Sequence, residues 1–172
     1  EIVSETLTFV ILHGAIGCIR QITKEDKNCP HNKASWMGGT LEVALYSIAN
    51  TIKYTSVSKD VLEKEEVIEH SIMIMTNNDN WVKNENVATY ALGILFLCTT
   101  LKDVEIRMSA YDKLLSPLIY CMKNYSDNAP VRSIVLGLLE NACAVLPRNR
   151  VESSGVLEAV SGLLKSGNSG QV

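Results

Sequence analysis

The stretch that decides the fold is residues 130–142, which read Pro130-Val131-Arg132-Ser133-Ile134-Val135-Leu136-Gly137-Leu138-Leu139-Glu140-Asn141-Ala142. Its apolar residues recur every three or four positions, the period of a helical stripe. The stripe consists of Val131, Ile134, Val135, Leu138, Leu139 and Ala142. Leu136 and Cys143 add apolar side chains on the remaining sides. We therefore expect this helix to be sandwiched between neighbours.

A similar helix occurs twice upstream, and a second type of helix recurs with it. Residues 44–50 align with residues 91–97 and 135–141, at offsets of 47 and 44. Residues 114–123 align with residues 156–165 at an offset of 42, and residues 67–76 align more loosely. A period in the forties is typical of stacked helical repeats. We expect Leu45, Leu92 and Leu136 to occupy similar surroundings.

Two of these segments resemble parts of the armadillo repeat. Residues 155–164, Gly-Val-Leu-Glu-Ala-Val-Ser-Gly-Leu-Leu, resemble its second helix, and Ala44-Leu45-x-x-Ile48-x-Asn50 resembles its long third helix. The resemblance covers residues 40–166. It implies an all-α fold, a right-handed α-solenoid of about three armadillo-like repeats.

We predict a single domain over residues 1–166. It divides into an N-terminal helix (1–23), a loop (24–39), a partial repeat (40–56), two repeats (57–101 and 102–146) and a second partial repeat (147–166). Within the third of these repeats we expect one helix over 103–112 and another over 113–124. Residues 167–172 are expected to form a flexible tail, and the chain to be a fragment of a longer protein.

The resemblance also implies where a partner binds. In armadillo proteins that hold extended peptides, the third helices line a concave groove, and an Asn at the position of Asn50 clamps the ligand backbone. An amide side chain suits this role because it both donates and accepts. Alignment gives Leu97 and Asn141 as the equivalent positions. The residues expected in the groove are Tyr46, Asn50, Lys53, Tyr90, Phe96, Leu97, Arg132 and Asn141.

The groove departs from one branch of the family. Nuclear-import receptors carry Trp four residues before the Asn, whereas the three aligned positions here are Tyr46, Gly93 and Gly137. The resemblance therefore does not extend to the import receptors.

Composition limits the classes of partner. The 172 residues include 16 basic and 19 acidic side chains, for a net charge of −3. No run of Lys or Arg provides the basic surface that nucleic acid requires. No stretch reaches the ~18 apolar residues of a membrane span, and no signal peptide is recognisable. The odd number of cysteines indicates a reducing, cytoplasmic location, a cytoskeletal one included. Cys98, Cys121 and Cys143 are expected to act as small apolar residues in helices.

No pattern indicates chemistry. Nucleophile, zinc-hydrolase and phosphate-loop motifs are all missing from the sequence. Cys29 and His31 flank Pro30 in the predicted loop, but no CxxC accompanies them. His70 is expected at the surface or at a boundary. We therefore predict a protein that is not an enzyme, with no cofactor and no metal.

Three hypotheses about function remain. The first is a scaffold or adaptor whose concave face holds a peptide or a partner helix. The second is a regulatory module that acts on a folded partner, such as a GTPase, a chaperone or a cytoskeletal component, through its edge or convex surface. For that hypothesis the acidic cluster over residues 60–69 and the loop over residues 24–39 matter more than the groove, although a solvated helix face is the more ordinary explanation of the acidic cluster. The third is a structural spacer within a longer array.

Overall fold

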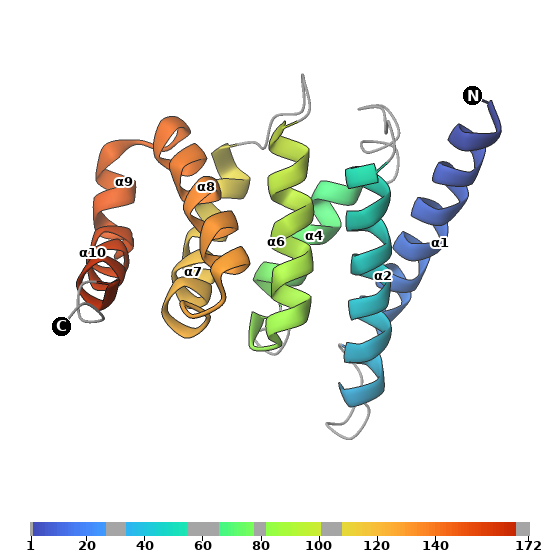
Figure 1. The fold of residues 1–172 in the computed structure, drawn as a ribbon, viewed down its shortest axis with the longest axis horizontal. Coiled ribbons are helices and arrows are strands. Elements are labelled where there is room, and N and C mark those ends of the chain that lie inside the picture. The colour runs from blue at the N-terminus through green and yellow to red at the C-terminus, as the bar shows by residue number, and fades with distance from the viewer. Residues whose placement is uncertain (1, 27–33, 55–65, 78–81, 101–107, 168–172) are drawn as a thin grey trace. The chain divides into compact units, whose positions relative to one another are not determined.

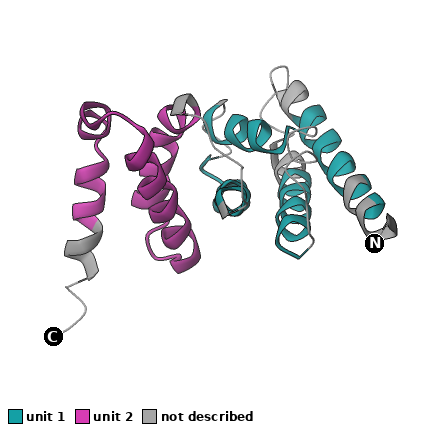
Figure 2. Ribbon diagram, turned by 90° about the horizontal axis from the view of Figure 1, so that it is seen from above, with its two compact units in different colours: residues 1–105 teal, residues 106–172 magenta. Residues whose placement is uncertain are grey.

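The computed structural model describes residues 2–26, 34–54, 66–77, 82–100 and 108–167, and within these ranges the chain forms helices and turns without any strand (Figure 1). The expected all-α class is thus confirmed. The helices are α1 (Ile2–Asp26), α2 (Ala34–Tyr54), α4 (Val67–Asn77), α6 (Glu85–Thr100), α7 (Met108–Asn124), α8 (Ala129–Val145), α9 (Arg148–Ser153) and α10 (Val156–Gly167). They fall into two compact units, residues 1–105 and 106–172 (Figure 2).

In the first unit, four helices pack as two layers. α1 lies against α4 in one layer, and α2 lies against α6 in the other (Figure 1). Contacts of α1 with α2 and of α4 with α6 join the layers. Leu12 and Ile16 of α1, Leu45 of α2 and Leu92 of α6 are fully buried in this core. Each helix therefore hides its apolar stripe on two neighbours.

The loop expected over residues 24–39 was wrong at both ends. α1 continues to Asp26 and α2 begins at Ala34, so only residues 27–33 lie outside the described part of the chain. Gly38 and Gly39 suggested a break because glycine disfavours a helix interior by about 1 kcal/mol. Burial of Leu41, Ala44 and Leu45 along the same helix offsets that cost.

In the second unit, α7 packs against α8 and α10, and α9 packs against α10. The expected break between residues 112 and 113 was wrong, since α7 runs unbroken from Met108 with Pro117 in its interior. The expected boundaries of α8 and α10 hold more closely. Asn128 caps α8 by accepting a hydrogen bond from the Val131 N–H. Before α10, Gly155 takes a φ of 85°, which favours glycine.

α8 carries the predicted apolar stripe but is not sandwiched. Its buried residues are Val131, Val135, Leu138, Leu139 and Ala142. Leu136 is 40% exposed and Cys143 is also exposed. Their apolar chemistry suggested burial on every side, but a helix with one deep stripe tolerates single apolar residues on its open side.

Burial corrects the register of the repeat. The buried set Leu41, Ala44, Leu45 and Ile48 recurs 47 residues later in α6, at Ala88, Ala91, Leu92 and Leu95, and 47 residues later again in α8, at Val135, Leu138, Leu139 and Ala142. The second type of helix follows the same period, because Val67, Ser71, Ile74 and Met75 of α4 correspond to Leu114, Leu118, Cys121 and Met122 of α7.

Leu139, not Leu136, is therefore the counterpart of Leu45 and Leu92. The alignment at an offset of 44 was wrong by three residues. A shift of three positions moves a residue by almost one helical turn and keeps most apolar letters matched. Letters alone could not separate the two registers, whereas burial does.

Candidate partner-binding face on α2 and α6

Two side-chain contacts fix how α2 and α6 lie beside each other. The rings of Tyr46 and Tyr90 meet edge to face, with centroids 5.4 Å apart. One turn earlier, the Asn86 Nδ2 donates to the Glu42 Oε1 at 3.0 Å. Both pairs join residues 44 apart in sequence, so the two helices run parallel and in register. We call the surface formed by residues 42–54 of α2 and 86–97 of α6 the α2/α6 face.

The α2 part of this face carries three of the predicted groove residues. Tyr46, Asn50 and Lys53 are spaced by four and three positions, so they lie along one side of the helix. Tyr46 is 51% exposed even though its ring contacts Tyr90, Lys53 is exposed, and Asn50 is half-buried. Within the described residues, no hydrogen bond engages the Asn50 side chain. Its amide is thus available to a ligand.

Tyr54 belongs to this face and was not predicted. Its ring is 72% exposed, and the Lys53 Nζ lies 5.0 Å from the ring centroid. A cation at this distance is attracted by the ring quadrupole. The exposed pair extends the face beyond Asn50 with both an aromatic surface and a positive charge. An aromatic residue next to Lys53 at the end of an apolar stripe was the available signal.

The α6 part of the face is more apolar. Tyr90, Phe96 and Leu97 are half-buried, whereas Ile94 and Leu95 between them are fully buried. Extending the register of the Tyr46–Tyr90 pair by one and two turns places Asn50 beside Ile94 and Lys53 beside Leu97. The face therefore combines half-exposed apolar groups on α6 with polar groups on α2.

The other two predicted groove residues belong to the second unit. Asn141 of α8 makes a side-chain hydrogen bond with Tyr111 of α7, a residue that is 3% exposed. Burial raises the pKa of Tyr111, and the bond to Asn141 partly offsets this effect. In the corrected register, the counterpart of Asn141 in α2 is Ser47 rather than Asn50. Its amide serves the packing of α7 on α8.

Arg132 also has a local partner. Its Nη1 donates to the Ser126 backbone oxygen at 2.8 Å, which fastens the turn before α8. The side chain is exposed. The six predicted residues of α2 and α6 thus share one unit, and Arg132 and Asn141 share the other.

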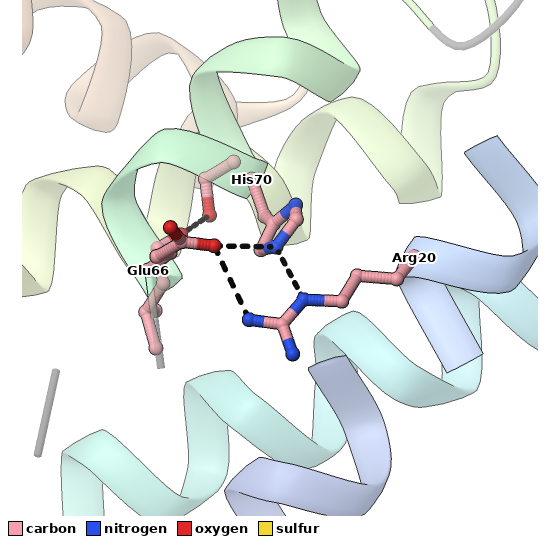
Figure 3. A network of polar contacts seen from close by, with 5 residues as sticks. Arg20, Glu66 and His70 are labelled. Carbon is pink, nitrogen blue, oxygen red and sulfur yellow. Dashed lines mark hydrogen bonds and ion pairs between the residues drawn. The ribbon is translucent and has the colours of Figure 1, made fainter. Parts of the chain in front are cut away.

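A polar cluster links α1 to α4 in the first unit (Figure 3). The Arg20 Nε donates to the His70 Nε2 at 3.1 Å, and the Arg20 Nη2 lies 3.2 Å from the Glu66 Oε2. Because Nε2 accepts, neutral His70 carries its proton on Nδ1. Burial, followed by the charge of Arg20, lowers the pKa of His70, while Glu66 and Glu69 oppose that shift. His70 is half-buried, which agrees with the expected boundary position.

Glu66 directly precedes α4 and has a φ of 53°, a conformation that non-glycine residues seldom adopt. Its contact with Arg20 ties this strained start to α1. The acidic residues Asp60, Glu63 and Glu65, on which the regulatory hypothesis depended, lie outside the described residues, as do Cys29 and His31.

The described residues contain no group of three or more His, Cys, Asp or Glu side chains placed to hold a metal ion. None of the described helices is both long and apolar enough to cross a membrane. Burial raises the pKa values of Cys98 and Cys121 to about 12, so both behave as the expected apolar thiols. Cys143 is exposed, which corrects the expectation for that residue.

No protein-family model, curated protein or solved structure matches this chain.

Proposed function

We propose that the chain is an armadillo-like α-solenoid that acts as a non-enzymatic protein-interaction domain. The burial pattern supports a repeat, because the buried positions of both types of helix recur with a period of 47 residues. The pairing of α2 with α6 supports stacking, because these two helices carry the same buried pattern and lie side by side. In this proposal, α2 and α6 are third helices, and their shared face is the concave one.

The single observation that carries the proposal is the α2/α6 face itself. Exposed Tyr46 rests against Tyr90, and the unengaged amide of Asn50 follows one turn later on the same side. An amide in that place offers one donor and one acceptor to the backbone of an extended peptide. The half-exposed side chains of Phe96 and Leu97 add apolar surface for the ligand's side chains.

Affinity capture with paired variants tests the proposal. The first variant combines Tyr46→Ala with Asn50→Ala on the α2/α6 face. The control combines Tyr125→Ala with Asn124→Ala in the second unit, where Tyr125 meets Tyr120 edge to face at 6.1 Å. The variant and its control thus each remove one member of a tyrosine pair and one side-chain amide.

We expect the first variant to lose partners that the wild type and the control retain. Circular dichroism and thermal unfolding establish that each variant is folded. A set of captured partners that survives Tyr46→Ala with Asn50→Ala contradicts binding on this face. Loss of the same partners in the control alone would assign binding to the second unit.

A further inference from the structure

The outward side of α1 is apolar and free of charge. Leu7 and Val10 are each 58% exposed, and Gly14, Gly17 and Gln21 continue the exposed side at steps of three and four residues. Residues 6–19 contain no Asp, Glu, Lys or Arg. A helix side that is apolar, exposed and uncharged over several turns is unusual on a free surface.

An apolar groove of about 550 Å³ adjoins this side, between α1 and α2. Ile11, Ala15 and Cys18 line it from α1, and Thr40, Val43 and Ser47 line it from α2. Val43 is 65% exposed. The groove and the outward side of α1 together form what we call the α1 end of the first unit.

The repeat shows that this end is an open stacking surface. In the period of 47 residues, Val43 corresponds to Tyr90, which is the α6 residue that packs on Tyr46 of α2. Thr40 corresponds in the same way to Val87, which is fully buried. The side of α2 that lines the groove is therefore the side by which α6 contacts its neighbour. It continues an established helix–helix interface that stops at α2.

The shape of α1 indicates which neighbour fits. Its exposed side is bulky toward the N-terminus, at Leu7, Val10 and Ile11, and small toward the C-terminus, at Gly14, Gly17 and Cys18. A side chain added at either glycine would meet no atom within 4 Å. Two such helices laid antiparallel, crossing at Gly14, set the bulky half of each against the small half of the other.

Charge favours the same neighbour. A two-fold interface brings each residue patch against its own copy, so any charge near the axis would meet a like charge. The α1 end has none between residues 6 and 19. We propose that two copies of this chain associate through their α1 ends about a two-fold axis, with α1 antiparallel to its copy and Val10 of each copy against Cys18 of the other.

Sedimentation equilibrium of the whole chain tests this, over about 1 µM to 1 mM, a range that brackets weak and moderate affinities. We expect a monomer–dimer equilibrium that Leu7→Glu with Val10→Glu weakens at least about tenfold, since it buries carboxylates against uncharged side chains of the partner. The control is Leu157→Glu on α10, an apolar side chain with a similar exposure of 55%. It should leave the equilibrium unchanged.

Gly14→Ala with Gly17→Ala separates folding from association. Because both positions open to free space, the alanines should raise the melting temperature through better helix propensity. The same methyl groups should weaken the dimer by blocking the close approach of the two helices. If the alanines strengthen association or leave it unchanged, the crossing at the glycines is contradicted.

Cross-linking locates the contact. In a Cys29→Ser, Cys143→Ser background, Val10→Cys should form a disulfide with the partner's Cys18, giving a covalent dimer that disappears with Cys18→Ser. The two positions are about 12 Å apart along one helix, beyond the reach of a disulfide within one chain. A chain that stays monomeric throughout the range, or a dimer lost only with Leu157→Glu, overturns the proposal.

Discussion

An asparagine on the corresponding helices has a different role in each of the two units. In the first unit, α2 and α6 turn Tyr46, Asn50 and Tyr90 toward an open face, and the amide of Asn50 has no hydrogen-bond partner among the described residues. In the second unit, α7 and α8 use Asn141 internally, on the hydroxyl of buried Tyr111. Two asparagines that the sequence alignment paired thus differ in whether their side-chain amide is hydrogen-bonded within the protein.

The largest effects should come from leucines in the corrected register. We expect Leu92→Ala and Leu139→Ala each to lower the free energy of unfolding by about 2–5 kcal/mol, because both side chains are buried and leave a cavity. Leu136→Ala should cost less than about 1 kcal/mol, since its side chain already contacts water. Urea denaturation measures all three. Equal costs at Leu136 and Leu139 would restore the offset of 44.

The two asparagines should separate next. Asn141→Ala should lower the free energy of unfolding by about 1–3 kcal/mol, because the buried hydroxyl of Tyr111 loses its partner. Asn50→Ala should change it by no more than about 0.5 kcal/mol. Tyr111→Phe with Asn141→Ala serves as the control, since removing both groups should recover part of the loss. If Asn50→Ala proves the more destabilising, the contrast between the units fails.

The N-terminal caps should behave alike in both units. The Asn84 Oδ1 accepts from the N–H groups of Asn86 and Val87 at 3.1 and 3.2 Å, and the Asn128 Oδ1 accepts from Val131 at 3.2 Å. Replacing either asparagine by alanine should cost about 1 kcal/mol in chemical denaturation. A cost confined to one of the two would show that α6 and α8 do not begin in the same way.

A histidine-dependent pH effect should be confined to the first unit, because the counterpart of His70 in α7 is Pro117. Burial and Arg20 lower the pKa of His70 in the folded chain. As the pH falls below about 6.5, the unfolded histidine gains a proton before the folded one does, so the folded state loses stability until its own lower pKa is reached.

His70→Gln should accordingly make the urea midpoint fall less between pH 7 and pH 5 than it does in the wild type. Carboxylates titrate alike in both proteins, so their contribution cancels in the comparison. A steeper fall in the variant would mean that Glu66 and Glu69 stabilise protonated His70 more than burial and Arg20 oppose it.

Local pattern predicted the helices well and their surroundings poorly. The stripe of α8, the turn at Gly155 and the span of α6 followed from apolar spacing and from glycine and proline, which act within a few residues. The exposure of Leu136 and Cys143 and the partner of Asn141 depend on neighbouring helices, which spacing does not specify. For the same reason Tyr46, Asn50 and Tyr90 could be named from the sequence, while the bond to Tyr111 could not.

The register of the repeat was predicted less well than the helices but better than their surroundings. Its existence was visible in the letters, but its value required burial, because a slip of three residues preserves an apolar match. Tyr54 was missed although it is next to Lys53, because its exposure does not follow from apolar spacing.

A double-mutant cycle on Tyr46 and Tyr90 tests most directly whether α2 and α6 form one face. The single changes Tyr46→Ala and Tyr90→Ala and their combination are compared by urea denaturation. Rings in edge-to-face contact at 5.4 Å should show a coupling of about 0.5–1.5 kcal/mol in the free energy of unfolding. Effects that add to within about 0.3 kcal/mol would show that the two rings do not meet, and would contradict the face on which the proposed function depends.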